Sequence, residues 1–285
     1  MINYPLNITI MKRLFLCSFI LTFCLTAALA QLSDERNVGS FNRIKTGGSF
    51  DIFVQPGNNE KIRIEAREGP IDKIETEVKG NTLHIYMEDN WWKNYTFKDV
   101  NIYITVRKLE AVESSGSGNV RVQTTIEGND VRVASSGSGN LICEKAIHSN
   151  DDLVISNSGS GDCKIRSSAN TEDNLKISNS GSGNMDIDEI TADVLDVQNS
   201  GSGGLEVYGG RVNHQSIVMS GSGNLDLGNV QSEICRISKS GSGNVHVSVR
   251  DELSGNSSGS GNIYLKGTTA RTNVNTSGSG KIKTN

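Results

Sequence analysis

The chain has 285 residues, of which 35% are hydrophobic, and its formal net charge is −4 at pH 7. This length allows one or two domains, and the apolar content is low but sufficient for a thin core. The sequence contains no basic block and no interleaving of aromatic with basic residues, which argues against a nucleic acid as its partner.

Residues 1–30 predict an export signal whose true start is Met11. Two basic residues follow this methionine, residues 14–25 form an apolar run, and residues 28–30 read Ala-Leu-Ala, the small-residue pattern of a cleavage site. The mature chain then begins at Gln31. An N-terminal membrane anchor is the alternative, but the apolar run is shorter than the roughly 20 residues that a spanning helix needs.

The mature chain keeps 26 basic and 32 acidic residues, a net charge of −6. It contains no further long apolar run, so we expect an exported protein with no transmembrane span. Its destination is the periplasm, the outer surface or the medium, and the sequence carries no signal for an oligomeric state.

Residues 31–110 form a first segment of irregular β-structure. Alternating apolar residues predict strands, and Lys79-Gly80-Asn81 predicts a turn between two of them. The strand patterns cover residues 50–54, 62–64, 83–86 and 102–106. A repetitive β-structure needs a cap so that its end does not offer open strand edges. We therefore expect this segment to cap the structure formed by residues 111–285.

The first segment also contains both tryptophans, Trp91 and Trp92. Adjacent residues cannot both point inward from a regular strand, so one of the two rings is expected to be exposed. Exposed aromatic rings often contact sugars or protein partners. A loop folded over the end of the core is the alternative explanation, in which case replacing both residues with alanine would impair folding rather than binding.

From residue 111 onward the chain is built around the phrase Ser-Gly-Ser-Gly, which occurs nine times. The intervals between copies are 21, 22, 22, 20, 20, 20, 18 and 19 residues. A near-constant period of about 20 residues is typical of a solenoid, in which one repeat forms one coil. The first serines of the copies, taken as position 0, are Ser115, Ser136, Ser158, Ser180, Ser200, Ser220, Ser240, Ser258 and Ser277.

The residues after the phrase predict a half-buried strand in every coil. Position +5 is apolar in all nine copies and position +7 in eight, whereas position +6 between them varies widely. Alternation with a period of two places +5 and +7 on the inner face and +6 on the outer face. The residues at +6 are Arg121, Ile142, Lys164, Asp186, Glu206, Asp226, His246, Tyr264 and Lys283.

A second strand is predicted before the phrase, because position −3 is Val or Ile in eight of the nine copies. If the same parity continues through the phrase, its glycines face inward and its serines outward. Inward glycines suit a corner where the backbone turns or where two walls approach closely. The remaining residues suggest a polar return with only isolated apolar positions, namely Ile126, Ile147, Ile190 and Val230.

Together these patterns predict an all-β fold, a right-handed parallel β-helix with an irregular N-terminal cap. Nine coils spaced about 4.8 Å apart make a rod of roughly 40 Å. Position +4 is mostly asparagine, so we expect a ladder of side-chain hydrogen bonds along the stack.

Three cysteines remain in the mature chain: Cys143, Cys163 and Cys235. The first two share the inner face but are displaced by two residues along the strand, which puts their Cα atoms roughly 8 Å apart. This separation is too large for an unstrained disulfide. We expect small core residues instead, since each stands where another coil has Val, Ile or Leu. No histidine occupies a neighbouring inward position, and the sequence indicates neither a metal nor a cofactor.

Position +6 supplies the main candidate site. Asp186, Glu206, Asp226, His246 and Tyr264 should stack on five consecutive coils, with neighbours about 5 Å apart. Three carboxylates in such a column would repel one another and raise their pKa values. The column could bind a glycan or a hard cation, or supply the paired acids of a glycosidase. The alternative is a solvated polar face without a ligand.

The opening of the mature chain, Phe41 followed by residues 48–54 (GSFDIFV), and the serial Gly-Ser-Gly-Asn-apolar repeats resemble the head GIN domain family of auto-transporter adhesins. These are exported proteins common in Bacteroidetes. The likeness runs from about residue 38 to residue 285, and it implies a single-stranded parallel β-helix at or near the cell envelope. It implies no catalytic residues.

These observations favour an exported, non-enzymatic β-solenoid that binds a glycan or another envelope or cell-surface component, or that serves as a structural spacer. No Ser, His and Asp arrangement singles itself out for catalysis. The alternative is a polysaccharide-active enzyme, a glycosidase or lyase, with the acids at +6 as its site. An irregular cleft over residues 186–246 would favour the enzyme, and a flat exposed stripe would favour binding.

Overall fold

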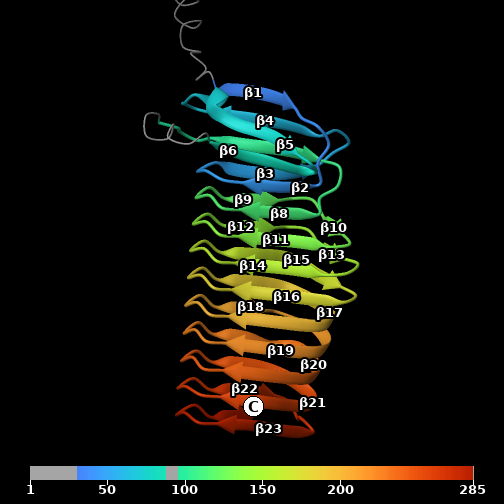
Figure 1. The fold of residues 1–285 in the computed structure, drawn as a ribbon, viewed down its shortest axis with the longest axis vertical. Helices are drawn as coiled ribbons and strands as arrows, with labels where there is room; N and C mark the ends of the chain where they lie inside the picture. Colours follow the sequence, from blue (N-terminus) through green and yellow to red (C-terminus); the bar gives the residue numbers. More distant parts are fainter. Residues whose placement is uncertain (1–30, 88–95, 285) are drawn as a thin grey trace, which may run out of the picture.

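The computed structural model describes residues 31–87 and 96–284, and it consists of stacked β-coils (Figure 1). The phrase forms the loops along the left edge of the rod in that view, and the chain winds right-handed from the cap downward. The predicted all-β solenoid is thus confirmed. None of the described segments is a helix with the length and apolarity needed to cross a lipid bilayer. The predicted export signal, residues 1–30, lies outside the described residues.

Each coil has an upstream wall that leads into the phrase and a downstream wall that follows it. Short strands of the upstream wall are β8 (Ala111–Ser114), β11 (Val131–Ser135), β14 (Leu153–Asn157), β16 (Asn174–Asn179) and β23 (Arg271–Thr276). Short strands of the downstream wall are β9 (Val120–Val122), β12 (Leu141–Cys143), β18 (Leu205–Val207), β22 (Ile263–Lys266) and β24 (Ile282–Thr284).

The polar return is more regular than the sequence suggests, because in the middle coils it forms a third parallel wall. This return wall contains β10 (Ile126–Gly128) and β13 (Ile147–Ser149), which pair in parallel. In later coils single strands run through the return: β15 (Cys163–Thr171), β17 (Met185–Asn199), β19 (Gly210–Met219), β20 (Leu225–Lys239) and β21 (Val245–Ser257). Ile126, Ile147, Ile190 and Val230 are all buried in this wall.

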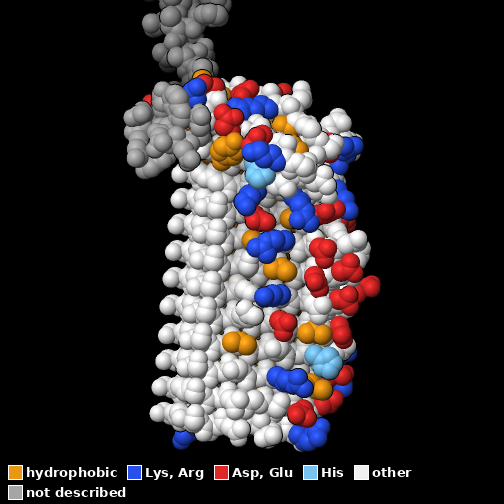
Figure 2. Space-filling view, in the orientation of Figure 1, with side chains coloured by type: hydrophobic (Ala, Val, Ile, Leu, Met, Phe, Trp, Pro, Cys, Tyr) orange, Lys and Arg blue, Asp and Glu red, His pale blue; other side chains and the backbone are white. Residues whose placement is uncertain are grey.

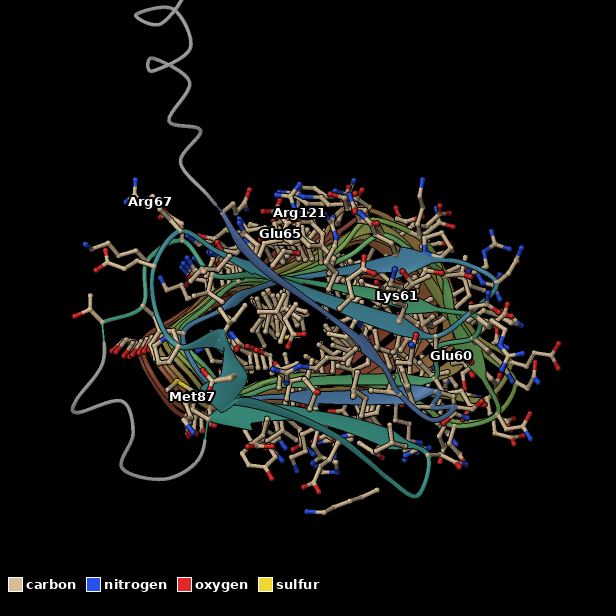
Figure 3. The ribbon with its side chains drawn as sticks, turned by 90° about the horizontal axis from the view of Figure 1, so that it is seen from above. Glu60, Lys61, Glu65, Arg67, Met87 and Arg121 are labelled. Atoms are coloured by element: carbon tan, nitrogen blue, oxygen red, sulfur yellow. The ribbon has the colours of Figure 1, made fainter. Side chains whose placement is uncertain are left out.

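Alternation along the strands produces the core. The residues at +5 and +7 are buried from the first copy through Leu265, while those at +6 remain partly or fully exposed. Figure 3, seen along the rod, shows the interior filled by side chains from the walls and Arg121, a +6 residue, on the outside.

The three mature cysteines are buried with free thiols. In the parallel strand register Cys143 lies opposite Ile165 rather than Cys163, as the predicted displacement requires. Burial raises the pKa of Cys163 and Cys235 to about 12.

The phrase glycines are required by the close approach of successive coils. A Cβ atom built on any of them from Gly137 to Gly243 would lie 1.8–2.0 Å from the carbonyl oxygen of the equivalent glycine one coil earlier. None of these glycines has a positive φ, and among the other phrase glycines only Gly259 does, at 132°. Turn geometry therefore does not explain their presence. All phrase serines are exposed, as predicted, and form the uncharged left edge in Figure 2.

The residue just before each of the first eight phrases is buried in the corner. In three consecutive coils it is asparagine, whose side-chain Nδ2 donates to the carbonyl of the last phrase glycine. Asn157, for example, donates to Gly161 at 3.0 Å. The next two coils place Met219 and Lys239 there, and Lys239 is only 2% exposed. Its ammonium donates to the carbonyl of Gly241 at 2.8 Å.

The predicted ladder at +4 is present, with the backbone as donor. Each side-chain oxygen accepts the main-chain N–H of the +4 residue in the next coil, at 2.8–3.1 Å. The ladder begins at Asp51 and is interrupted at Gly204, which has no side chain to offer to Asn224. Its other members are Asn119, Asn140, Asp162, Asn184, Asn224, Asn244, Asn262 and the terminal donor Lys281.

Replacing Gly204 with asparagine should repair this interruption and stabilise the protein by about 0.5–1.5 kcal/mol. A Cβ atom at Gly204 meets its nearest neighbours at 3.4 and 3.5 Å, which is ordinary contact. Urea unfolding would measure the gain. Gly209→Asn is the control, because it adds the same side chain where nothing lies within 3.8 Å. An equal increase in the free energy of unfolding in both variants would show that the missing hydrogen bond at Gly204 contributes nothing.

The part of the cap next to the repeats is one additional coil that lacks the phrase. Strands β2 (Arg43–Thr46) and β3 (Asp51–Pro56) pair in parallel with β8 and β9 of the first phrase-bearing coil. The residues at Gly48 and Phe50 take the places of the two phrase glycines, since a Cβ on Gly116 or Gly118 would strike their carbonyl oxygens. The sequence signal for this coil is Asp51 at +4, followed by the alternation from Ile52 to Val54.

The remaining cap strands close the end of the rod, and five of the seven cap strands pair partly or wholly in the antiparallel sense. Parallel pairing continues from β2 to β6 (Thr82–Met87) and from β3 to β7 (Asn101–Val106). The antiparallel partners are β4 (Lys61–Ala66) on β7, β1 (Leu32–Asn37) on β4, and β5 (Ile74–Lys79) on β6, where the predicted turn at Gly80 and Asn81 joins two strands. A 3₁₀ turn, η1 (Ile71–Lys73), precedes β5.

Candidate functional site

The structure brings the five predicted residues of position +6 into one column on the downstream wall. Parallel pairing sets each of them directly opposite the next, on five consecutive coils. We call this column the acidic–aromatic stripe: Asp186, Glu206, Asp226, His246 and Tyr264. The tryptophans predicted as a second site, Trp91 and Trp92, lie outside the described residues.

The acidic half of the stripe is less repulsive than three bare carboxylates would be. At its start Lys164 lies 3.2 Å from Asp186, and this carboxylate raises the pKa of the lysine, chiefly by accepting its hydrogen bond. Asp226 accepts the main-chain N–H of Gly228 at 3.0 Å. Its second oxygen lies 3.7 Å from Nδ1 of His246. Two of the three acids therefore have partners of their own, which relieves the predicted repulsion.

The aromatic half of the stripe is held by contacts on both sides. The rings of His246 and Tyr264 lie 4.6 Å apart, centroid to centroid, at an angle of 50°. The side-chain amide of Asn262 donates to the Tyr264 hydroxyl at 3.3 Å. The Lys283 ammonium lies 5.3 Å from the centroid of the same ring. Tyr264 is thus a half-buried ring held in place by three neighbours.

A further aromatic residue, Tyr208, joins the stripe although the sequence analysis did not single it out. It is 47% exposed and stands two residues after Glu206, on the same outer face. The negative charges of Glu206 and Asp186 raise the pKa of Tyr208, so its hydroxyl stays protonated. Position +8 holds an aromatic residue in this coil alone, and its even spacing from +6 is the signal that could have identified it.

This arrangement can recognise a sugar but offers little shelter for a reaction. Carboxylates accept hydrogen bonds from hydroxyl groups, and tyrosine rings pack against apolar faces while keeping a polar tip. The stripe lies on the open face of a sheet, and the side chains of Asp226 and His246 are 44% and 42% exposed. Within residues 31–87 and 96–284 no group of three or more His, Cys, Asp or Glu side chains is arranged to hold a metal ion.

Solved structures share this architecture. A putative adhesin from Parabacteroides merdae superposes with a TM-score of 0.66 at 20% identity, covering 90% of this chain and 96% of the other. A putative lipid binding protein from Parabacteroides distasonis gives 0.63 at 22% identity, with coverage of 90% and 96%. A putative adhesin from the same species gives 0.62 at 20% identity, with coverage of 90% and 97%. These likenesses show the fold.

No curated protein matches the chain. A family model described as "Putative auto-transporter adhesin, head GIN domain" matches residues 40–173 and 153–269. The two matches together span most of the coils described above, including the phrase-free first coil. The chain therefore belongs to the family of putative auto-transporter adhesin head GIN domains.

Proposed function

We propose that this protein is an exported, non-enzymatic recognition rod that binds a glycan of a cell envelope or cell surface through the acidic–aromatic stripe and Tyr208. The observation that carries the proposal is the gathering of three carboxylates and two tyrosines on one open face. The adhesin-like family and the export signal expected in residues 1–30 agree with a role outside the cytoplasm.

The negative charge of the stripe favours neutral sugars and amino sugars over anionic sugars as ligands. Three carboxylates repel anionic sugars, whereas they accept hydrogen bonds from neutral sugars and attract amino sugars. A stack of coils about 4.8 Å apart also presents these groups at regular intervals along a line. A linear neutral or amino-sugar chain lying along the rod fits both features.

Binding agrees better with this surface than glycoside hydrolysis does. A glycosidase needs one carboxyl group kept protonated by an apolar, water-excluding site, beside a second that stays ionised. Asp186 instead pairs with a lysine and Asp226 with a main-chain N–H, and both lie on an exposed face. These contacts favour binding over the polysaccharide-active alternative.

Replacing Tyr208 and Tyr264 together with alanine should weaken glycan binding about tenfold or more, because tyrosine is among the residues that most often carry the binding energy of an interface. The measurement is a screen of the intact mature protein on immobilised neutral and amino-sugar glycans, followed by titration of the best ligand. Changing Asp186, Glu206 and Asp226 to asparagine should weaken the same interaction.

Tyr86→Ala provides the matched control, since Tyr86 is also an exposed tyrosine, 36% accessible, but lies on the cap. Circular dichroism should report an unchanged β-fold in every variant. The proposal fails if the stripe variants bind the selected glycan as well as the wild type does, or if the control variant loses as much affinity as they do.

A further inference from the structure

The chain between the seventh and eighth phrases is shortened where the downstream wall turns into the return wall. Only 18 residues separate Ser240 from Ser258, compared with 20 in the preceding coils. Pairing between β20 and β21 jumps from Leu227 opposite Val247 to Gln231 opposite Ser248, so three residues of β20 have no counterpart. The corner between the downstream and return walls is therefore three residues shorter at this level, while Ser248 and Val249 continue the return wall.

This shortening leaves a notch between the longer coils on either side. Lys266 Nζ reaches across the short coil to Asn229 Oδ1 at 2.7 Å, a contact that spans 37 residues of sequence. The notch has a volume of about 270 Å³. This equals the space of about nine water molecules, which is room for one sugar ring.

Three cations surround this notch, compared with a single carboxylate in its wall, Glu233. Arg250 is committed to Glu233 at 2.8 Å and to Asp251 at 2.9 Å. Arg211 contacts only the neutral Gln231, at 3.4 Å. Arg211 and Lys266 thus carry positive charge that no acid in the described residues balances by an ion pair.

The surroundings of the notch make this charge distinctive. Toward the cap, the same edge of the rod is acidic, and Figure 2 shows red side chains gathered along the right-hand edge of the middle coils. The exposed acids there are Glu127, Asp130, Asp151, Asp152, Glu172, Asp173 and Asp193. These acids make the neighbouring part of the edge unfavourable for an anion, in contrast to Arg211 and Lys266 at the notch.

The floor of the notch contains a buried polar pair. The hydroxyl of Ser232, which is 3% exposed, lies 3.3 Å from Oε1 of Gln215 and 3.2 Å from the carbonyl of Ser248. Gln215 is 2% exposed, and its Nε2 has no partner in the protein. The three preceding coils have leucine at this position: Leu153, Leu175 and Leu195. Gln215 thus replaces an apolar core residue behind the wall of the notch and leaves one buried donor without a protein partner.

We infer that this notch is a second binding site, which takes a sugar acid with its carboxylate between Arg211 and Lys266. Asn213, Gln231 and Thr268 in the wall can hydrogen-bond to the ring hydroxyls. The site lies on another wall and carries the opposite charge from the acidic–aromatic stripe, so it does not depend on the function proposed for the stripe.

Isothermal titration of the mature protein with glucuronate tests the inference, with glucose and inorganic phosphate as comparison ligands. We expect glucuronate to bind more tightly than either, because glucose lacks the charge and phosphate lacks the ring. The double variant Arg211→Gln and Lys266→Gln should bind glucuronate about tenfold more weakly or worse, since each lost contact is a hydrogen bond to a charged group. Added salt should weaken binding of the wild type.

The matched control is Lys176→Gln with Arg236→Gln, two exposed cations on the upstream wall. This variant has the same net charge as the notch variant and should keep the wild-type affinity within about twofold. Equal losses in the two double variants would reduce the effect to general electrostatics and overturn the inference. Tighter binding of phosphate than of glucuronate would overturn the assignment to a sugar, and absence of glucuronate binding to the wild type would overturn the site itself. None of these outcomes bears on neutral-glycan binding by the stripe.

Discussion

Replacing Gly181 with alanine should destabilise the rod by about 3 kcal/mol, the upper end of the usual cost of overpacking a well-packed interior. The new Cβ atom would lie 1.9 Å from the carbonyl oxygen of Gly159. The same oxygen accepts the N–H groups of Ser182 and Gly183, at 3.1 and 3.3 Å. Relief of the clash would separate two coils and break both hydrogen bonds.

Urea unfolding followed by circular dichroism would measure this loss. Ser182→Ala is the matched control, because its side chain is exposed and the variant should stay within about 0.5 kcal/mol of the wild type. If Gly181→Ala were equally benign, the close contact between successive phrases could not be the reason for the glycines.

The second large effect concerns Lys239, and here we expect a substitution to stabilise the protein. Lys239→Met places in the corner the residue that the preceding coil already has there, Met219. Lys239 is 2% exposed, and among the described residues no carboxylate lies within ion-pairing distance of it. Removing a buried charge without a counterion should raise the free energy of unfolding at pH 7 by about 1–3 kcal/mol.

The pH dependence of this gain identifies its cause. Burial lowers the pKa of Lys239 below its ordinary value of 10.5. Below the lowered pKa both the folded and the unfolded chain carry the proton, so the cost of burying the charge is fully present. Between the lowered pKa and 10.5 only the unfolded chain keeps the proton, and stability therefore rises with pH. The advantage of Lys239→Met should shrink across this window and vanish above it.

Lys176→Met is the control for this experiment, because Lys176 lies exposed on the upstream wall. Its effect on the unfolding free energy should be small at every pH between 7 and 11. A stabilisation by Lys239→Met that stays constant over the same range would point to better packing rather than to removal of a charge.

Most of the solenoid can be predicted from the repeat alone. Each position of the coil occurs in up to nine copies, so its residue types indicate whether it is buried or exposed. Position +5 is apolar in nine copies, which requires burial, and position +6 varies freely, which requires exposure. Once the coils are in register, any +6 residues of consecutive copies must be neighbours. The stripe from Asp186 to Tyr264 could therefore be predicted as a column, while its role as a binding surface stays a prediction.

Features that occur once could not be inferred in this way. The first coil lacks the phrase, and Phe50 stands where later coils have glycine, so it does not match the repeat that identifies the others. The residue before the phrase looks polar and exposed by composition, yet Asn157 is buried because the glycine carbonyls in the corner need donors. Side-chain contacts of the stripe, such as those of Tyr208, depend on local geometry that alternation does not determine.

A stack of nearly identical coils raises a question of alignment during folding. A chain segment paired with the wrong neighbour, one coil out of place, would still match serine with serine and glycine with glycine, so the phrase does little to penalise such an error. The antiparallel cap, the unequal coil lengths and single departures such as Lys239 are the features that distinguish one level from another. The cap thus fixes which coil pairs with which. A chain without residues 31–110 should fold into a mixture of rods whose coils are paired in different registers.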